Sequence, residues 1–183
     1  MKRSFPILLL LAPALAGCNP ESPTSPPGDI AAAPGLNQAL KRSAVPISGR
    51  CEGSYEIIPI DFLPPPFEDL AAHGRVLVRE TCHVAHLGKS TTLGENLTDF
   101  TGDPFVSAGS IVLTAANGDE LWAAETGAVP GPGPNEAFTW TGSLTFTGGT
   151  GRFRSATGTA TFVGGGSTTN GTNFRSFHGT IAY

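Results

Sequence analysis

The chain has 183 residues, which suits one folded domain with additional segments. Only 14% of the residues are charged, whereas 24 are glycine and 16 are proline, and this composition is typical of an all-β domain with frequent turns. The formal net charge of -4 gives no basic surface, so we expect no nucleic-acid partner.

The N-terminus has the order of parts of an export signal. Lys2 and Arg3 precede an apolar run over 5–15 that is too short to span a bilayer. The next residues, L-A-G-C at 15–18, resemble the lipobox of bacterial lipoproteins, which implies cleavage before Cys18 and its acylation. Each buried methylene contributes roughly 0.8 kcal/mol, so two or three acyl chains would hold the protein on a membrane. The alternative is an ordinary secretory signal with a chance cysteine.

These features predict three segments and a location. We expect a signal peptide over 1–17, a lipidated, proline-rich, disordered tether over 18–47, and a folded domain over 48–183. Asn19 follows the cysteine, which resembles the default route to the outer membrane in a Gram-negative cell. The expected place is the bacterial cell envelope, with the domain in the periplasm or at the cell surface.

The domain is predicted to be all-β, because apolar and polar residues alternate and no run has a period of 3.6. A glycine-rich corner at 148–153 joins two runs, and Asn117-Gly118 predicts a hairpin turn between two others. Eight antiparallel strands in sequence order predict an up-and-down β-barrel without sheet edges, with a two-sheet sandwich as the alternative. The expected strands cover 51–58, 75–87, 91–100, 110–116, 119–126, 138–147, 155–163 and 174–183.

Several segments resemble the allene oxide cyclase-like barrel, a fold related to dirigent proteins. They are F-T-G-G-T-G-R-F at 146–153 with A-T-G at 156–158, H-L-G-K at 86–89, A-A-N-G-D-E-L at 115–121 and H-G-T-I at 178–181. The resemblance implies an eight-stranded barrel with an apolar interior, and for the plant enzyme the cyclisation of a fatty-acid epoxide. Lys89 stands where plant members carry an acidic residue, and no stretch matches the plant catalytic positions.

The expected strand 75–87 carries the candidate catalytic residues, Glu80 and His86. Both share a strand face with the valines of this segment, so if that face lines the barrel both project inward. Burial shifts the pKa of such groups, and shifted groups often mark sites. The alternative places one of them in water at a barrel mouth. His83 and His86 point to opposite faces of the strand, so we expect no metal site there.

The aromatic residues of the domain are expected to fill the barrel, with a stack against a ligand as the alternative. These residues are Trp122, Phe138, Trp140 and Phe146. The glycine-rich corner at 148–153 has neither the lysine nor the strand-to-helix context of a phosphate-binding loop, so we expect no cofactor.

Cys51 and Cys82 remain once Cys18 is lipidated. The export signal directs them to a compartment in which disulfides form. If the first two strands pair antiparallel about the loop 59–73, the two cysteines oppose each other. We therefore predict a Cys51–Cys82 disulfide that pins the first strand to the second; two free, packed thiols are the alternative.

Three classes of function remain open. The first is a membrane-anchored barrel that binds a small apolar molecule or a partner. The second is an isomerase or cyclase acting on a lipid-derived substrate, which would need an inward Glu or His. The third is a structural envelope protein, because an eight-stranded barrel is either filled by side chains or holds one small ligand. A homo-oligomer is compatible with each of the three classes.

Overall fold

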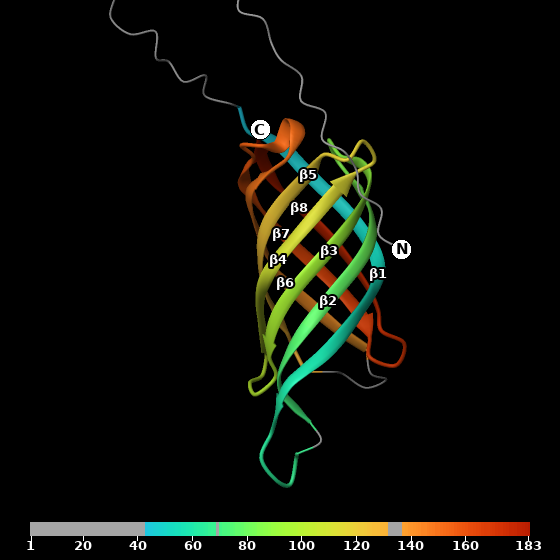
Figure 1. Ribbon diagram of the computed structural model, residues 1–183, viewed down its shortest axis with the longest axis vertical. Coiled ribbons are helices and arrows are strands. Elements are labelled where there is room, and N and C mark those ends of the chain that lie inside the picture. Colours follow the sequence, from blue (N-terminus) through green and yellow to red (C-terminus); the bar gives the residue numbers. More distant parts are fainter. Residues whose placement is uncertain (1–42, 69, 132–136) are drawn as a thin grey trace, which may run out of the picture. The chain divides into compact units, whose positions relative to one another are not determined.

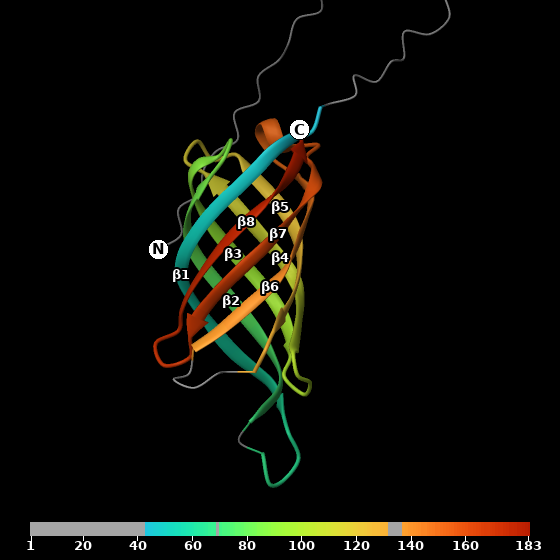
Figure 2. The ribbon, with the colours of Figure 1, turned by 180° about the vertical axis from the view of Figure 1, so that it is seen from behind.

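The computed structural model describes residues 43–68, 70–131 and 137–183, so the predicted signal peptide, Cys18 and most of the tether lie outside the described residues. In this part of the chain, eight antiparallel strands follow sequence order and close into a barrel (Figures 1 and 2). The predicted up-and-down barrel is confirmed and the sandwich is wrong. The elements are β1 (Val45–Phe62), β2 (Ala71–Val84), β3 (Gly88–Asp99), β4 (Phe105–Ala115), β5 (Glu120–Val129), β6 (Ala137–Gly149), the 3₁₀ helix η1 (Gly151–Phe153), β7 (Thr157–Ser167) and β8 (Thr172–Ala182).

Closure depends on β1, which pairs with β2 on one side and with β8 on the other. The β1–β8 register runs from Val45 opposite Ile181 to Ser54 opposite Thr172, so β1 begins three residues before Ser48. Because each strand then has two neighbours, its backbone groups are paired along both edges. No helix in the described ranges is long and apolar enough to cross a membrane.

The β1–β2 hairpin is longer than the sequence predicted. Both strands continue into the expected loop 59–73, with Phe62 still opposite Ala71. The pairing shifts register after Pro59 and again after Asp61, because the extended hairpin leaves the regular wall of the barrel. It projects beyond one end of the barrel, at the bottom of Figure 1. The turn itself is held by backbone bonds, with Leu63 N donating to Leu70 O at 2.9 Å.

The barrel has two ends that differ in their interiors. We call the end that carries η1 and the C-terminus, uppermost in Figure 1, the packed end. Its interior is filled by buried apolar side chains, which include Ile47, Leu113, Leu121, Leu144, Phe146, Phe153 and Ile181. We call the opposite end, from which the β1–β2 hairpin projects, the open end. The two interiors belong to the same strands, so inward side chains alone decide the difference.

The glycine-rich corner closes the packed end. Phe153 is fully buried beneath it, with its ring centroid 5.0 Å from that of Tyr183. Gly151 has a φ of +52°, a conformation that favours glycine, and a Cβ there would also force the Asp119 carboxylate to move. Arg152 donates to the carbonyl of His86 and lies 3.7 Å from Asp119 Oδ2. The corner thus ties three turns together, and its role is structural.

Candidate functional site

The open end of the barrel holds an apolar cavity of about 150 Å³. A cavity of about this volume accepts one benzene-sized molecule. Its walls are side chains of seven strands and the loops beside them, namely Tyr55, Ile57, Val76, Val78, Asn96, Thr98, Phe100, Phe105, Ser107, Val129, Phe138, Trp140, Thr168 and Asn173.

The cavity is lined by aromatic and β-branched side chains together with smaller polar ones. Thr98 and Ser107 occupy neighbouring positions on β3 and β4, and Thr98 Oγ1 donates to Ser107 Oγ at 3.2 Å. Their polar atoms are therefore turned toward each other. Tyr55 closes part of the wall, with its ring edge-to-face against Phe138 at 5.5 Å. Partial burial raises the pKa of the Tyr55 hydroxyl, so it stays neutral.

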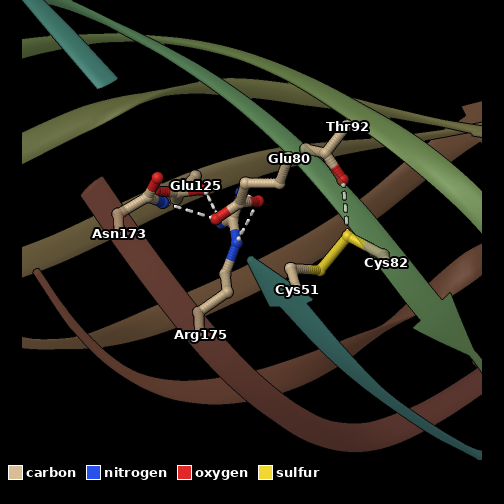
Figure 3. Close-up of a disulfide and its surroundings, with 7 residues drawn as sticks. All are labelled: Cys51, Glu80, Cys82, Thr92, Glu125, Asn173 and Arg175. Atoms are coloured by element: carbon tan, nitrogen blue, oxygen red, sulfur yellow. Dashed lines mark hydrogen bonds and ion pairs between the residues drawn. A yellow bond between two sulfur atoms is a disulfide. The ribbon is translucent and has the colours of Figure 1, made fainter. Parts of the chain in front are cut away.

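A buried polar layer forms the floor of the cavity, and we define it as Glu80, Asn96, Glu125, Asn173 and Arg175. Arg175 bridges the two carboxylates, with Nη2 donating to Glu80 Oε2 at 2.6 Å and Nη1 to Glu125 Oε2 at 2.7 Å (Figure 3). Asn173 Nδ2 donates to Glu80 Oε1 at 2.6 Å, and Asn96 Nδ2 to Glu125 Oε1 at 3.1 Å. All four carboxylate oxygens therefore accept a hydrogen bond.

Arg175 is the centre of this layer, and its side chain is 1% exposed. Burial alone would lower the pKa of the guanidinium, but Glu125 and Glu80 outweigh it and the pKa is raised. The guanidinium also lies 5.4 Å from the ring centroid of Trp140 and 5.9 Å from that of Phe162. A buried charge of this kind is tolerated only when it is paired and hydrogen-bonded.

Three polar atoms at the cavity have no hydrogen-bond partner among the described residues: Asn96 Oδ1, Asn173 Oδ1 and Trp140 Nε1. All three residues line the cavity. Such atoms are uncommon in buried positions, because an unpaired buried donor or acceptor costs about 1–3 kcal/mol. They are buried, unpartnered polar atoms on residues that line the cavity.

The structure separates the two predicted catalytic candidates. Glu80 faces the interior as its strand phase predicted, and it is 4% exposed. His86 does not face inward: β2 ends at Val84, and His86 lies exposed in the following turn with a φ of +69°. Its Nε2 lies 2.8 Å from the carbonyl of Pro46. The strand phase therefore stops two residues before His86, and this residue lies at the packed end, away from the cavity.

The predicted aromatic filling is confirmed for two of the four side chains. Trp140 and Phe146 are buried, and Phe138 lines the cavity. Trp122 is 41% exposed, so its predicted place inside the barrel is wrong. Successive side chains of a strand point to opposite faces, and Leu121 points inward, so Trp122 must point outward.

The Cys51–Cys82 disulfide is present, with Cα atoms 4.1 Å apart. The two cysteines oppose each other in a register that runs unshifted from Gly49 and Val84 to Pro59 and its partner, as the sequence predicted. The bond lies beside the polar layer, as Figure 3 shows. Both sulfurs come within 4.8 Å of a Glu80 oxygen, a grouping that could hold a metal ion. In the disulfide state, however, neither sulfur is a thiolate, the form that binds metals.

Four members of the polar layer were not predicted from the sequence: Asn96, Glu125, Asn173 and Arg175. A signal for two of them was present in the strand phase. Glu125 alternates in step with the buried Leu121 on β5, and Arg175 with the buried Phe177 on β8. A charged residue in an inward phase on two strands indicates an internal ion pair.

In comparisons with known proteins, no family model matches the chain and no curated protein matches its sequence. The fold and the site geometry therefore carry the functional argument.

Proposed function

We propose that this protein is a lipid-anchored lipoprotein of the bacterial cell envelope whose barrel, of the allene oxide cyclase-like type, binds one small apolar molecule at its open end. The observation that carries the proposal is the cavity of about 150 Å³, whose walls are mainly valine, isoleucine and aromatic side chains. Burial of apolar surface is favourable by about 25 cal/mol per Å², so an apolar guest gains affinity from these walls. The L-A-G-C motif at 15–18 supports the anchor.

The hydrogen bonds of the buried carboxylates favour a binding function over isomerase or cyclase chemistry. A general acid or base must come within hydrogen-bond reach of the reacting group. Both oxygens of Glu80 accept bonds from Asn173 and Arg175, and both oxygens of Glu125 accept bonds within the same layer. His86 lies at the other end of the barrel, so it has no access to a guest in the cavity.

A purely structural role is less well supported, because a structural barrel needs no interior space. The packed end illustrates the alternative, since its inward side chains fill it completely enough to leave Leu121, Leu144 and Ile181 fully buried. The open end instead combines an apolar wall with a built polar floor. Side chains arranged this way are typical of small-molecule sites, in which a few placed polar groups lie in an apolar pocket.

Native mass spectrometry of the purified protein tests the binding proposal. We expect a co-purified or added small apolar molecule to remain bound at one equivalent. Val76→Phe should abolish that species because the added ring fills the cavity, whereas Leu97→Phe should retain it because Leu97 is exposed on the outer wall. Equal occupancy in the two variants would contradict binding in this cavity.

Membrane fractionation tests the anchor separately. Cys18→Ser removes the predicted acylation site, so we expect the protein to leave the membrane fraction. A variant that still sediments with the membranes would refute the lipoprotein assignment and leave the cavity proposal standing.

A further inference from the structure

The floor of the cavity indicates which head group a ligand carries, and this inference rests on the proposed binding function. Asn96 is 2% exposed and Asn173 is 6% exposed, yet each has an amide oxygen without a partner in the described parts of the chain. Both residues line the same cavity. Two buried acceptors at one cavity floor need a donor, and the polar layer itself provides none to them.

The orientation of both amides is fixed by the carboxylates behind them. A carboxylate oxygen only accepts, so the Nδ2 of Asn173 must face Glu80, and the Nδ2 of Asn96 must face Glu125. Each amide oxygen therefore points away from its glutamate, as Figure 3 shows for Asn173. If either amide flipped, its oxygen would face a carboxylate oxygen, and two acceptors would oppose each other. The buried glutamates therefore fix the amide oxygens as the atoms that need a donor.

Among the residues that the structure describes, none donates to either amide oxygen. Asn96 Oδ1 lies against the bare backbone of Gly109, where a Cβ would be 2.3 Å from the oxygen. The third unpartnered atom, Trp140 Nε1, is a donor at the cavity wall beside Gly164, where a Cβ would lie 2.1 Å from it. The site therefore has two acceptors and one donor, all uncharged, and Asn96 and Trp140 pack into space that only glycine at 109 and 164 leaves free.

Charge decides between head groups. The layer holds two carboxylates and one guanidinium, and every guanidinium nitrogen already donates to a carboxylate. An anionic head group would meet amide oxygens backed by carboxylates and would find no free cation, which makes its burial very unfavourable. A neutral hydroxyl can donate to an amide oxygen and accept from an indole N–H, so it matches the unpartnered atoms in both kind and charge.

We propose that the cavity selects small apolar molecules that carry a neutral hydroxyl, bound with the hydroxyl on the floor between Asn96 and Asn173, and that it excludes carboxylates. The cavity volume of about 150 Å³ limits the buried part to a ring or short chain of benzene size. A longer molecule would extend past the aromatic side chains at the mouth.

Tryptophan fluorescence provides the test, because the chain has two tryptophans and only Trp140 lines the cavity. Trp122→Phe removes the exposed one. In the full chain carrying Trp122→Phe and Cys18→Ser, so that no acyl chain competes, Trp140 emission is titrated with toluene, benzyl alcohol and benzoate. These probes share a ring and differ in the head group. We expect benzyl alcohol to bind at least as tightly as toluene, and benzoate more than 100-fold more weakly.

The outcomes separate this inference from the proposed function. If the floor gave the hydroxyl no partner, burying it would make benzyl alcohol bind roughly tenfold or more weakly than toluene. That result would overturn the head-group inference while the proposed binding function stood. Benzoate binding as tightly as the alcohol would overturn it too. Failure of all three probes would overturn the binding function, and this inference with it.

Asn173→Leu sharpens the test on the protein side. It removes one acceptor, so we expect benzyl alcohol to lose about tenfold in affinity while toluene keeps its affinity, which also shows that the variant is folded. Thr161→Val is the control, because Thr161 is exposed on the outer face of β7 and does not line the cavity. A loss of alcohol affinity equal in the two variants would contradict the role of the floor.

Discussion

The two ends of the barrel share the same eight described strands and the same alternation of side chains, yet they have different interiors. At the packed end, Leu121, Leu144 and Phe153 meet in the middle and leave no exposure. At the open end, Val76, Thr98 and several aromatic side chains line the interior, and a cavity remains between them. The fully buried apolar side chains are therefore concentrated at the packed end.

The polar layer marks the boundary between the two interiors. It lies between the Cys51–Cys82 disulfide and the cavity, and Arg175 connects strands from opposite sides of the barrel. A fully connected buried network of this kind specifies a unique register, because a shifted strand would leave charges unpaired. We therefore expect mutations in this boundary layer to lower the stability most.

Arg175→Met is expected to have the largest effect. It leaves two buried carboxylates without their cation, and breaking a buried ion pair in this way costs about 3–5 kcal/mol. Urea denaturation would measure the loss in the free energy of unfolding. Arg50→Met is the control, since Arg50 is exposed on β1 and should change stability by less than about 0.5 kcal/mol. Similar losses in both variants would contradict a paired boundary layer.

Loss of the disulfide is expected to follow. Cys51 and Cys82 are separated by 31 residues, and closing a loop of this length stabilises by about 3–4 kcal/mol in the chain-entropy model. The double variant Cys51→Ala and Cys82→Ala should show this loss in thermal denaturation under oxidising conditions. Under reducing conditions the wild type and the variant should become similar in stability. An undiminished difference after full reduction would show that packing, not the cross-link, is responsible.

Truncations to alanine at the two ends should differ in cost. Leu144→Ala at the packed end removes a fully buried side chain and should cost about 2–5 kcal/mol. Val129→Ala enlarges a cavity that already exists, so we expect a cost of about 1 kcal/mol or less. The free energies of unfolding from denaturant titration give the comparison. Equal costs at the two positions would mean that both ends contribute equally to stability.

The smallest effect concerns Asp99 at the open end. Hydrogen bonds from the Thr101 hydroxyl and backbone N–H lower the pKa of the Asp99 carboxyl. Because the pKa is lowered in the folded state, this contribution is present above the ordinary Asp pKa and is lost as pH falls through the folded value. Thr101→Ala should raise the pKa of Asp99 in an NMR titration with little change in stability near neutral pH. An unchanged pKa would contradict the assignment.

The sequence predicted the barrel and the disulfide because both follow from alternation and register. Alternation with period 2 needs only local information, and the opposition of Cys51 and Cys82 needs only one hairpin. Glu80 was placed inward by the same reasoning. The same reasoning placed His86 inward too, but His86 is exposed, because the strand ends at Val84 and phase carries no information beyond a strand end.

The floor and the cavity could not be predicted in the same way. Arg175 contacts Glu125 and Glu80, which lie 50 and 95 residues away in the sequence. These contacts depend on barrel closure and on the relative height of several strands, which no single hairpin determines. The cavity depends on the summed volume of inward side chains, so composition alone does not show which end is hollow.

A xenon-pressurised crystal tests the central claim most directly, because xenon occupies dry apolar cavities of about 150 Å³. We expect one xenon site at the open end, bounded by Val78, Phe138 and Trp140, and none among Leu121 and Leu144 at the packed end. Xenon in the packed end, or an open end that excludes xenon, would contradict a barrel that is filled at one end and hollow at the other.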